Sequence, residues 1–491
     1  MLTEKESLYG RIQNHLVDGE LPADFSLIPR KDKNQITFAD GARDGIAIYH
    51  MGQADVTEES MGLLAELMCD VSDGRREAGR QKLLEFAKKN TPLNAIDDFE
   101  QYIIDHANEL NAKRLHEFAV ECMESLDVDL VKFGMEILEV FSEPGETEKE
   151  MIRTLGLCDE FTLFSIFNML CWEDANNEIF ALAQKVHGWG RIHAVERLEP
   201  ENDVIRDWLL KEGIHNRVVP DYSALEVYEK AKIREMLSAE LTGEQLDCIA
   251  AVIRSLMSEG PVQGISAIGD ADGMLLEFIG QAVRHGSALS MHVCDAVHGI
   301  AGAKCPEEVT RAAWEFLRRK EVDNAVRGWV QEGEMIELAQ ALGIDYYEPL
   351  YQCMERDFGR HFYQCAALMA DDTYREKVLG LFRKKLPMQE MVAELEDNRG
   401  LGEEYADYSK LVYLVQNLED YPMCGGDFVE LALQSPVVSN RNMALRVLDH
   451  WCKKKECTLD SLSGRLAERV RVLKTKECSE SVLENMEKYG F

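Results

Sequence analysis

The chain has 491 residues, of which 46% are apolar and 29% are charged, and its formal net charge is -35. A chain this acidic repels nucleic acid over most of its surface, because nucleic-acid binding depends on neutralising phosphates with Lys and Arg. The sequence has no apolar run of the roughly 18 residues that a transmembrane helix needs. Its N-terminus lacks the basic start and apolar stretch of a secretory signal. We therefore expect a cytoplasmic protein without a membrane partner.

The first predicted element is a helix from Thr3 to Leu16, in which Leu8, Ile12 and Leu16 recur at four-residue spacing. Residues 20–58 have a different composition, with runs of strand-forming residues at 25–28, 35–38 and 46–49. Between these runs, Asp40-Gly41 and Asp44-Gly45 favour turns. We predict that residues 1–58 form this helix and a small non-helical extension, an extended or hairpin segment that caps the helical body. The pattern leaves open whether strands form.

From Ser60 onward the periodicity predicts helices almost throughout. In the clearest case, Thr242 to Met257, Thr242 and Gln245 match a capping box. The apolar residues that follow form one stripe along the helix, and Gly260-Pro261 ends it. We find no alternation of strands and helices. The predicted fold class is therefore all-α, with residues 59–491 as one helical body.

The segment Ser439-Asn440-Arg441-Asn442-Met443-Ala444-Leu445 resembles the second helix of a HEAT repeat, with its cap, arginine and alanine. The resemblance implies an irregular α-solenoid of stacked helix pairs. Such solenoids expose an extended concave surface, which implies a scaffold or binding protein with a protein or peptide partner.

The most distinctive stretch runs from Gly188 to Arg217, where two Trp, two His and four Arg lie among glycine and proline breaks. On a helix from Arg191 to Leu198, His193, Glu196 and Arg197 fall on one side, opposite the apolar arc. A His beside a carboxylate can exchange protons, and Arg can bind an anionic group. The lead-in Gly188-Trp189-Gly190 suits a backbone that approaches another group closely. The candidate binding residues are Trp189, Arg191, His193, Glu196, Arg197, Trp208, His215 and Arg217.

Two interpretations of this stretch remain open. In the first, these side chains line a site for a small anionic substrate, and His193 and Arg197 are accessible. In the second, they join one repeat to the next, and both tryptophans are buried. Together with residues 40–46, the stretch also resembles a group of uncharacterised bacterial proteins, some labelled "limonene hydroxylase". We do not carry that activity over, because the chain has no motif for an oxygen-activating cofactor.

Metal and cofactor motifs are absent from the sequence. His285, His292, Cys294, Asp295 and His298 are chemically competent ligands, but their spacing matches no known site. The glycine-rich stretch at 260–273 lacks the residues of a phosphate-binding or calcium-binding loop. The 13 cysteines are scattered and form no C-x-x-C pair, which favours free thiols. We predict neither a metal nor a cofactor.

One basic region interrupts the acidic sequence. Residues 441–476 contain ten Lys or Arg and four Asp or Glu. This stretch is the candidate for nucleic-acid binding, although we expect it to pair with acidic groups of the chain instead. The predicted function is therefore a helical-repeat scaffold or binding protein. The alternatives are an enzyme that uses the 188–217 stretch and a nucleic-acid-binding protein that uses residues 441–476.

Overall fold

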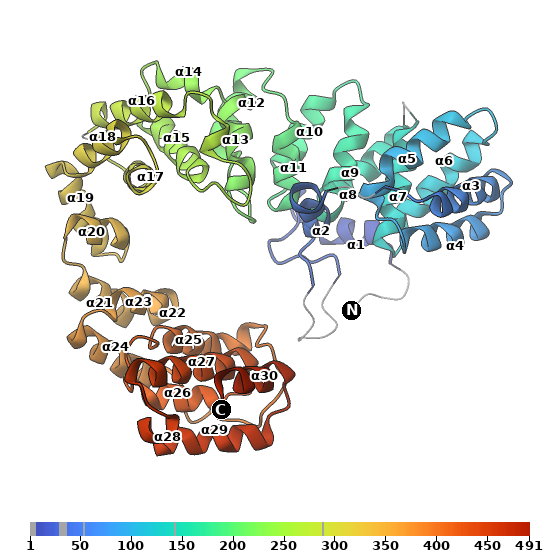
Figure 1. The fold of residues 1–491 in the computed structure, drawn as a ribbon. Coiled ribbons are helices and arrows are strands. Elements are labelled where there is room, and N and C mark those ends of the chain that lie inside the picture. Colours follow the sequence, from blue (N-terminus) through green and yellow to red (C-terminus); the bar gives the residue numbers. More distant parts are fainter. Residues whose placement is uncertain (1–5, 29–36, 53–54, 142–143, 287–288) are drawn as a thin grey trace. The chain divides into compact units, whose positions relative to one another are not determined.

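The structure is a computed structural model that describes residues 6–28, 37–52, 55–141, 144–286 and 289–491. These residues divide into two compact units (Figure 1). Unit 1 comprises the described residues up to Phe316, and unit 2 begins at Leu317. The boundary therefore falls inside the helical region, and the described part of residues 1–58 belongs to unit 1.

The fold is all-α, as the sequence predicts. Apart from two isolated β-bridges, the described residues form helices, turns and irregular segments. None of the described helices has both the length and the apolar character needed to cross a membrane. The helices of unit 1 are α1 (Leu8–His15), α2 (Ala42–Ile46), the π-helix η1 (Ala47–Met51), α3 (Glu58–Ser72), α4 (Arg76–Ala87), α5 (Pro92–Asp105), α6 (Ala112–Met123), α7 (Val128–Glu139), α8 (Glu146–Gly156), α9 (Asp159–Leu170), α10 (Ala175–Ala183), α11 (Trp189–Arg197), α12 (Asp203–Glu212), α13 (Asp221–Lys230), α14 (Ile233–Leu237), α15 (Gly243–Leu256), the 3-10 helix η2 (Ile265–Ala267), α16 (Ala271–Arg284), α17 (Met291–Gly302) and α18 (Glu307–Leu317), which ends at the boundary.

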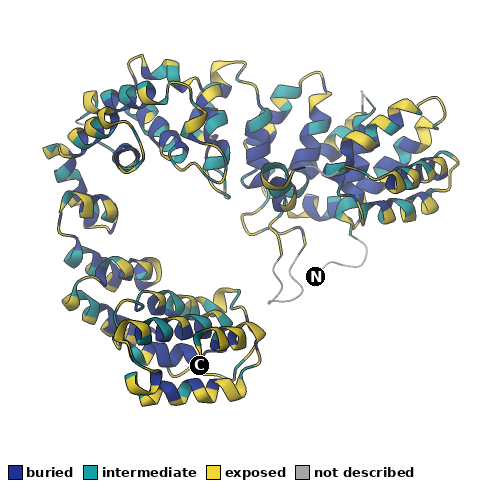
Figure 2. Ribbon diagram, viewed as in Figure 1, coloured by how far each residue is buried: buried dark blue, intermediate teal, exposed yellow. Residues whose placement is uncertain are grey.

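Successive odd-numbered helices of unit 1 contact one another in turn, from α7 through α9, α11, α13 and α15 to α17. The helix before each of α7, α9, α11 and α13 packs against it, so the chain alternates between two rows (Figure 1). Buried residues gather where these helices face each other (Figure 2). Helix α11, which contains five of the eight candidate residues, lies between α9 and α13.

Unit 2 is also helical. Its longest helix, α27, contacts α25, α26 and α30 and forms the centre of the unit. An irregular stretch separates α24 from α25. The helices of unit 2 are α19 (Lys320–Val330), α20 (Ile336–Leu342), α21 (Tyr347–Arg356), α22 (Phe358–His361), the 3-10 helix η3 (Phe362–Gln364), α23 (Cys365–Leu368), α24 (Asp372–Lys385), the 3-10 helix η4 (Glu403–Tyr405), α25 (Ala406–Gln416), α26 (Gly426–Leu433), α27 (Val438–Lys455), α28 (Leu459–Leu462), α29 (Gly464–Lys476) and α30 (Glu480–Tyr489).

Local sequence signals are accurate at several helix ends. Helix α15 begins with the predicted capping box, because Thr242 Oγ1 accepts the N–H of Gln245 and the Gln245 side chain accepts the N–H of Thr242. The first helix is shorter than predicted at both ends, and residues 1–5 lie outside the described residues.

The prediction for residues 46–49 is wrong. This run is helical, in the last residue of α2 and in η1, and residues 25–28 form an irregular segment. Part of the predicted run at 35–38 lies outside the described residues. The strand-like composition misled the prediction because Ile46 and Tyr49 pack against α11. Tertiary burial selects the same apolar and aromatic residues that strands prefer.

Candidate functional site

The start of α11 is a close contact between backbone and carboxylate. Asp159, the first residue of α9, accepts the N–H of Gly190 at 3.0 Å. A Cβ atom at Gly188 would lie 2.2 Å from Asp159 Oδ2, so any side chain there would collide with the carboxylate. The close approach predicted from Gly188-Trp189-Gly190 is therefore confirmed, and the approaching group is a carboxylate that caps the helix.

Arg191 joins neighbouring helices. Its side chain is buried, and it donates from Nε to the carbonyl of Val186 at 2.7 Å and from Nη1 to the carbonyl of Glu212 at 3.1 Å. Its guanidinium lies 5.1 Å from the ring centroid of Trp208. These contacts connect α10, α11 and α12. Arg191 therefore fits the interpretation in which the stretch joins repeats, since its donors already have acceptors.

His193 is buried, with 1% of its surface exposed, so the prediction that it is accessible is wrong. The helical periodicity placed His193 opposite the apolar arc of the helix, but Tyr49, from residues 37–52 near the N-terminus, covers this side of the helix. The Tyr49 ring stacks on the His193 ring with centroids 6.4 Å apart and planes 7° apart. Both ring nitrogens of His193 lack a hydrogen-bond partner among the described residues. Burial lowers the pKa of His193, which favours the neutral ring.

Aromatic packing holds the N-terminal segment, residues 37–52, on α11. Tyr49, Trp189 and Tyr222 lie with ring centroids 4.9 to 6.1 Å apart. A Cβ atom at Gly45 would lie 2.1 Å from the Trp189 ring, so only glycine allows this approach. Ala42, Trp189 and Ile192 form the buried core of the contact. Trp189 is 6% exposed, which places it in this core, as the second interpretation predicts.

A buried cation also anchors this segment. Lys132 of α7 is 2% exposed and lies 2.6 Å from Asp44 Oδ2 and 2.5 Å from Glu160 Oε1. Burial alone would lower the pKa of Lys132, but Glu160 and Asp44 raise it instead. The N–H of Gly41 donates to the other oxygen of Glu160 at 2.7 Å. The N-terminal segment is thus connected to α7 and α9 by charges that are withdrawn from water.

Glu196 and Arg197 lie at the partly exposed end of α11. The guanidinium of Arg197 donates to Glu196 Oε2 at 2.7 Å and lies 5.4 Å from the ring centroid of Phe167. Tyr49 donates its hydroxyl to the same Glu196 oxygen at 3.2 Å. Burial alone would raise the pKa of Glu196, but the neighbouring His193 and Arg197 lower it to about 2. Arg197 keeps 21% of its side-chain surface exposed, so it is accessible in part.

The other three candidate residues lie farther along the chain. Trp208 of α12 is half-buried and contacts Phe180 edge-on, with ring centroids 5.5 Å apart. His215 and Arg217 are exposed. The structure therefore does not gather the eight candidates in one site. Arg191 and His193 are buried in contacts between helices, whereas Trp189 and Arg217 line a common pocket.

The common pocket of about 490 Å³, here called the α11 pocket, lies between the residues before α2 and the starts of α9 and α11. Its apolar wall includes Phe25, Trp189 and Val218. Its polar wall carries both carboxylates and cations. The lining residues are Leu21, Pro22, Ala23, Phe25, Ala39, Asp40, Leu157, Cys158, Asp159, Lys185, Val186, His187, Gly188, Trp189, Arg217 and Val218. The volume is within the range of small-molecule sites.

The carboxyl groups of the pocket titrate abnormally. Burial raises the pKa of Asp159 to about 6, and the backbone N–H groups of Gly190 and Gly188 limit the rise. Burial also raises the pKa of Asp40, which accepts the N–H of Leu27 at 2.9 Å. Burial and the charges of Arg191 and Arg217 lower the pKa of His187. Perturbed groups that converge on one pocket are a physical signature of a functional site.

Two cations at this pocket form no close ion pair, although the charge of Arg217 lowers the pKa of Asp159. Lys185 and Arg217 are exposed, and their side chains form no hydrogen bond or ion pair with any described residue. His187, beside them, lies 3.8 Å from Glu20. The arrangement offers exposed cations, carboxyl groups whose pKa values are raised by burial, and an apolar wall. Such a pocket can bind a small organic anion.

Sequence reasoning identified Gly188, Trp189 and Arg217 but missed the carboxylates. Asp159 and Asp40 are distant in sequence from α11, and no spacing connects them to it. The two glycines signalled that a group approaches the backbone without showing which one. The basic residues Lys185 and His187 directly precede the stretch, and the cluster of charge before Gly188 could have extended the candidate site.

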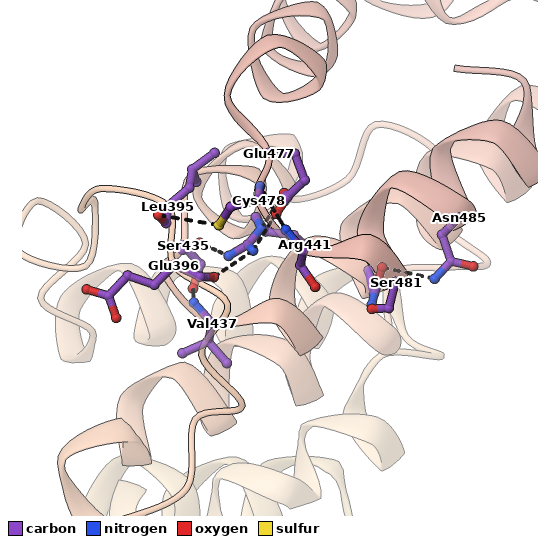
Figure 3. A network of polar contacts seen from close by, with 11 residues as sticks. Leu395, Glu396, Ser435, Val437, Arg441, Glu477, Cys478, Ser481 and Asn485 are labelled. Atoms are coloured by element: carbon purple, nitrogen blue, oxygen red, sulfur yellow. Dashed lines mark hydrogen bonds and ion pairs between the residues drawn. The ribbon is translucent and has the colours of Figure 1, made fainter. Parts of the chain in front are cut away.

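The basic region 441–476 is largely paired within unit 2. Arg441 has no exposed side-chain surface and forms an ion pair with Glu477 at 2.8 Å. It also donates to the carbonyls of Ser435 and Glu396, both at 2.8 Å (Figure 3). Arg465 and Arg469 lie 2.7 and 2.8 Å from Glu430. The predicted pairing with acidic groups is therefore present at these residues.

The residues 285–298 do not share one helix. His285 is the C-cap of α16, and α17 begins only at Met291. Asp295 forms an ion pair with Arg254 at 3.1 Å, and Cys294 is buried. Across the described residues, no group of three or more His, Cys, Asp or Glu is placed to hold a metal ion.

Comparisons of the chain with family models, curated proteins and solved structures found no match.

Proposed function

We propose that this protein is a cytoplasmic helical-repeat binding protein, a HEAT-like α-solenoid that binds a small organic anion in the α11 pocket. The alternation of helices between two rows in unit 1 supports the repeat architecture. The 13 cysteines, all unpaired, support a reducing compartment. The role as a scaffold for a protein partner belongs to the same proposal and rests on the architecture alone.

The observation that carries the ligand proposal is the pair of exposed cations, Lys185 and Arg217, which line a partly apolar pocket and form no hydrogen bond or close ion pair with any described residue. A carboxylate, sulfonate or phosphate group of the ligand would form an ion pair with them. The apolar part of the ligand would contact Trp189 and Phe25. Protonation of Asp40 or Asp159 would reduce repulsion of the anion, and their raised pKa values favour that protonation.

A fluorescent aromatic sulfonate, 1-anilinonaphthalene-8-sulfonate, tests the proposal, because it combines an anionic group with an apolar body. We expect it to bind with one high-affinity site. The Lys185→Ala/Arg217→Ala variant should weaken that binding roughly tenfold, since two exposed charge pairs contribute about 0.5–1 kcal/mol each. Lys88→Ala, an exposed lysine at the end of α4, is the matched control. Equal affinity in all three proteins would contradict the proposal.

A reaction at the same pocket is the second candidate function. Asp159, with a pKa of about 6, can exchange protons near neutral pH, and the nearby His187, whose pKa is lowered by burial, favours the neutral ring that can accept a proton. Binding and catalysis are distinguished by whether the ligand is chemically changed. A binding protein returns a panel of carboxylates and phosphate esters unchanged in NMR spectra. Turnover of one compound that is lost in Asp159→Asn would favour an enzyme.

A further inference from the structure

Unit 2 contains a second open site, independent of the α11 pocket. A groove of about 600 Å³, here called the α29 groove, lies between α29, the end of α26 and residues 392–395. Val392 and Val472 expose 46% and 36% of their surface there. The lining residues are Val392, Ala393, Glu394, Leu395, Leu433, Gln434, Arg469, Val472, Leu473 and Lys476.

One wall of this groove is a non-helical edge of main chain, residues 392–395. The backbone N–H groups of residues 392–395 and the carbonyl groups of residues 392–394 have no hydrogen-bond partner among the described residues. Residues 392–394 are exposed. An open edge of this kind can pair with an added extended chain.

Contacts at residues 395 and 396 fix the C-terminal end of this edge. Arg441 Nη2 donates to the carbonyl of Glu396 at 2.8 Å, and the Cys478 thiol lies 3.7 Å from the carbonyl of Leu395 (Figure 3). Farther along, Asn398 forms a parallel β-bridge with Val437. The chain therefore pairs in β fashion three residues beyond the edge. A fixed edge lowers the entropic cost of binding, because less chain has to be ordered.

The charged residues that line the groove indicate which kind of partner segment it favours. Two cations, Arg469 and Lys476, and one carboxylate, Glu394, line it. Arg469 is already paired with Glu430, whereas Lys476 is exposed and has no ion pair or hydrogen bond with any described residue. Because the rest of the chain is strongly acidic, this basic rim is a local exception. Charge complementarity favours a segment that carries carboxylates beside its apolar side chains.

We propose that the α29 groove binds an extended peptide segment of a partner protein, one with alternating apolar and acidic residues. The peptide pairs through its main chain with residues 392–395. Successive side chains of an extended chain point to opposite sides, so its apolar residues enter the groove beside Val472 and Leu473. Its acidic residues stay at the rim, where Lys476 attracts them. This site does not depend on the ligand of the α11 pocket.

Fluorescence polarisation with the full-length chain tests this proposal. The probe is a short fluorescein-labelled peptide of alternating Val and Glu, which we expect to bind saturably. A peptide with the same sequence but with alternate backbone nitrogens methylated should not bind, because it cannot donate to the edge. This second probe leaves the protein unchanged, so its result does not depend on the folding of a variant.

Substitutions in the protein locate the binding. Lys476→Glu should weaken the binding of the Val/Glu peptide about fivefold, since it replaces an exposed attractive charge pair with the peptide by a repulsive one. Lys455→Glu, at an exposed lysine of the same unit that does not line the groove, should leave binding unchanged. Equal binding of the methylated peptide, or no loss in Lys476→Glu, would overturn the proposal. Tighter binding of a labelled oligo(dT) that Lys476→Glu abolishes would instead assign the groove to nucleic acid.

Discussion

Replacing Lys132 with Met tests how strongly the N-terminal segment is anchored to unit 1. Methionine keeps much of the apolar length of lysine but removes its charge. Asp44 and Glu160, whose side chains are 7% and 15% exposed, would then face each other without their cation. Removing one partner from a buried ion pair costs about 3–5 kcal/mol.

A second argument gives a similar free-energy cost for Lys132→Met and predicts that this cost depends on pH. Without Lys132, the least costly response is to protonate one carboxyl group, most readily Asp44, because Glu160 still accepts the N–H of Gly41. Protonating an aspartic acid side chain in water costs about 4 kcal/mol at pH 7 and about 1.5 kcal/mol at pH 5. The destabilisation by Lys132→Met should therefore shrink as the pH falls. Asp44→Asn in the same chain should recover much of the loss at pH 7.

The assay is urea unfolding at pH 7 and pH 5, followed by tryptophan fluorescence and circular dichroism. The fit needs two transitions, because the chain divides into two compact units. Only the transition of unit 1 should move. A loss below about 1 kcal/mol at pH 7, or an equal loss at both pH values, would refute the reasoning.

Three further predictions concern the same unit. Gly188→Ala should lower the free energy of unfolding by about 1–3 kcal/mol in urea titrations, because its Cβ would lie 2.2 Å from Asp159 Oδ2. The control Gly280→Ala, whose Cβ would meet no close atom in α16, should be neutral or stabilising. A larger loss of stability in Gly280→Ala than in Gly188→Ala would contradict this packing. Arg191→Ala should cost about 1–3 kcal/mol, because it leaves the buried carbonyl of Val186 unpaired and removes one of the two donors to the carbonyl of Glu212, which keeps the N–H of His215. His215→Ala should stay within about 0.5 kcal/mol, and similar thermal shifts for both variants would argue against a structural Arg191. Burial and the neighbouring Glu100 raise the pKa of Glu139 to about 8. At pH values above the ordinary pKa of Glu, the folded state therefore binds more protons than the unfolded state, and stability should fall as the pH rises toward 8. Glu139→Gln should make this fall smaller in thermal melts recorded across the same pH range, and an unchanged dependence of stability on pH would count against the raised pKa.

The sequence predicts the helical part of the fold well, because helix periodicity and caps are local signals. The capping box of Thr242 and Gln245 and the glycine approach at Gly188 are examples. Side chains that face away from an apolar arc are harder to place, because an element from elsewhere in the chain can cover them. His193 is buried for this reason, under Tyr49, and no local pattern connects those two residues.

The candidate site was predictable only in part. Trp189 and Arg217 belong to the α11 pocket, but Asp40 and Asp159 enter it from other segments. Likewise, the ion pair of Lys132 with Asp44 joins residues that are far apart in the sequence, and Asp44 alone reads as a turn residue before Gly45. Long-range pairing of this kind has no signature in a single sequence, so the electrostatics of the pocket required the structure.

Hydrogen–deuterium exchange with and without 1-anilinonaphthalene-8-sulfonate tests the central claim most directly, because it shows where an organic anion binds. We predict slower exchange of the backbone N–H groups at residues 185–189 and 217–218, which line the α11 pocket. The same protection should be absent in the Lys185→Ala/Arg217→Ala variant. Protection confined to other segments, or unchanged exchange at 185–189 under saturating probe, would contradict the claim.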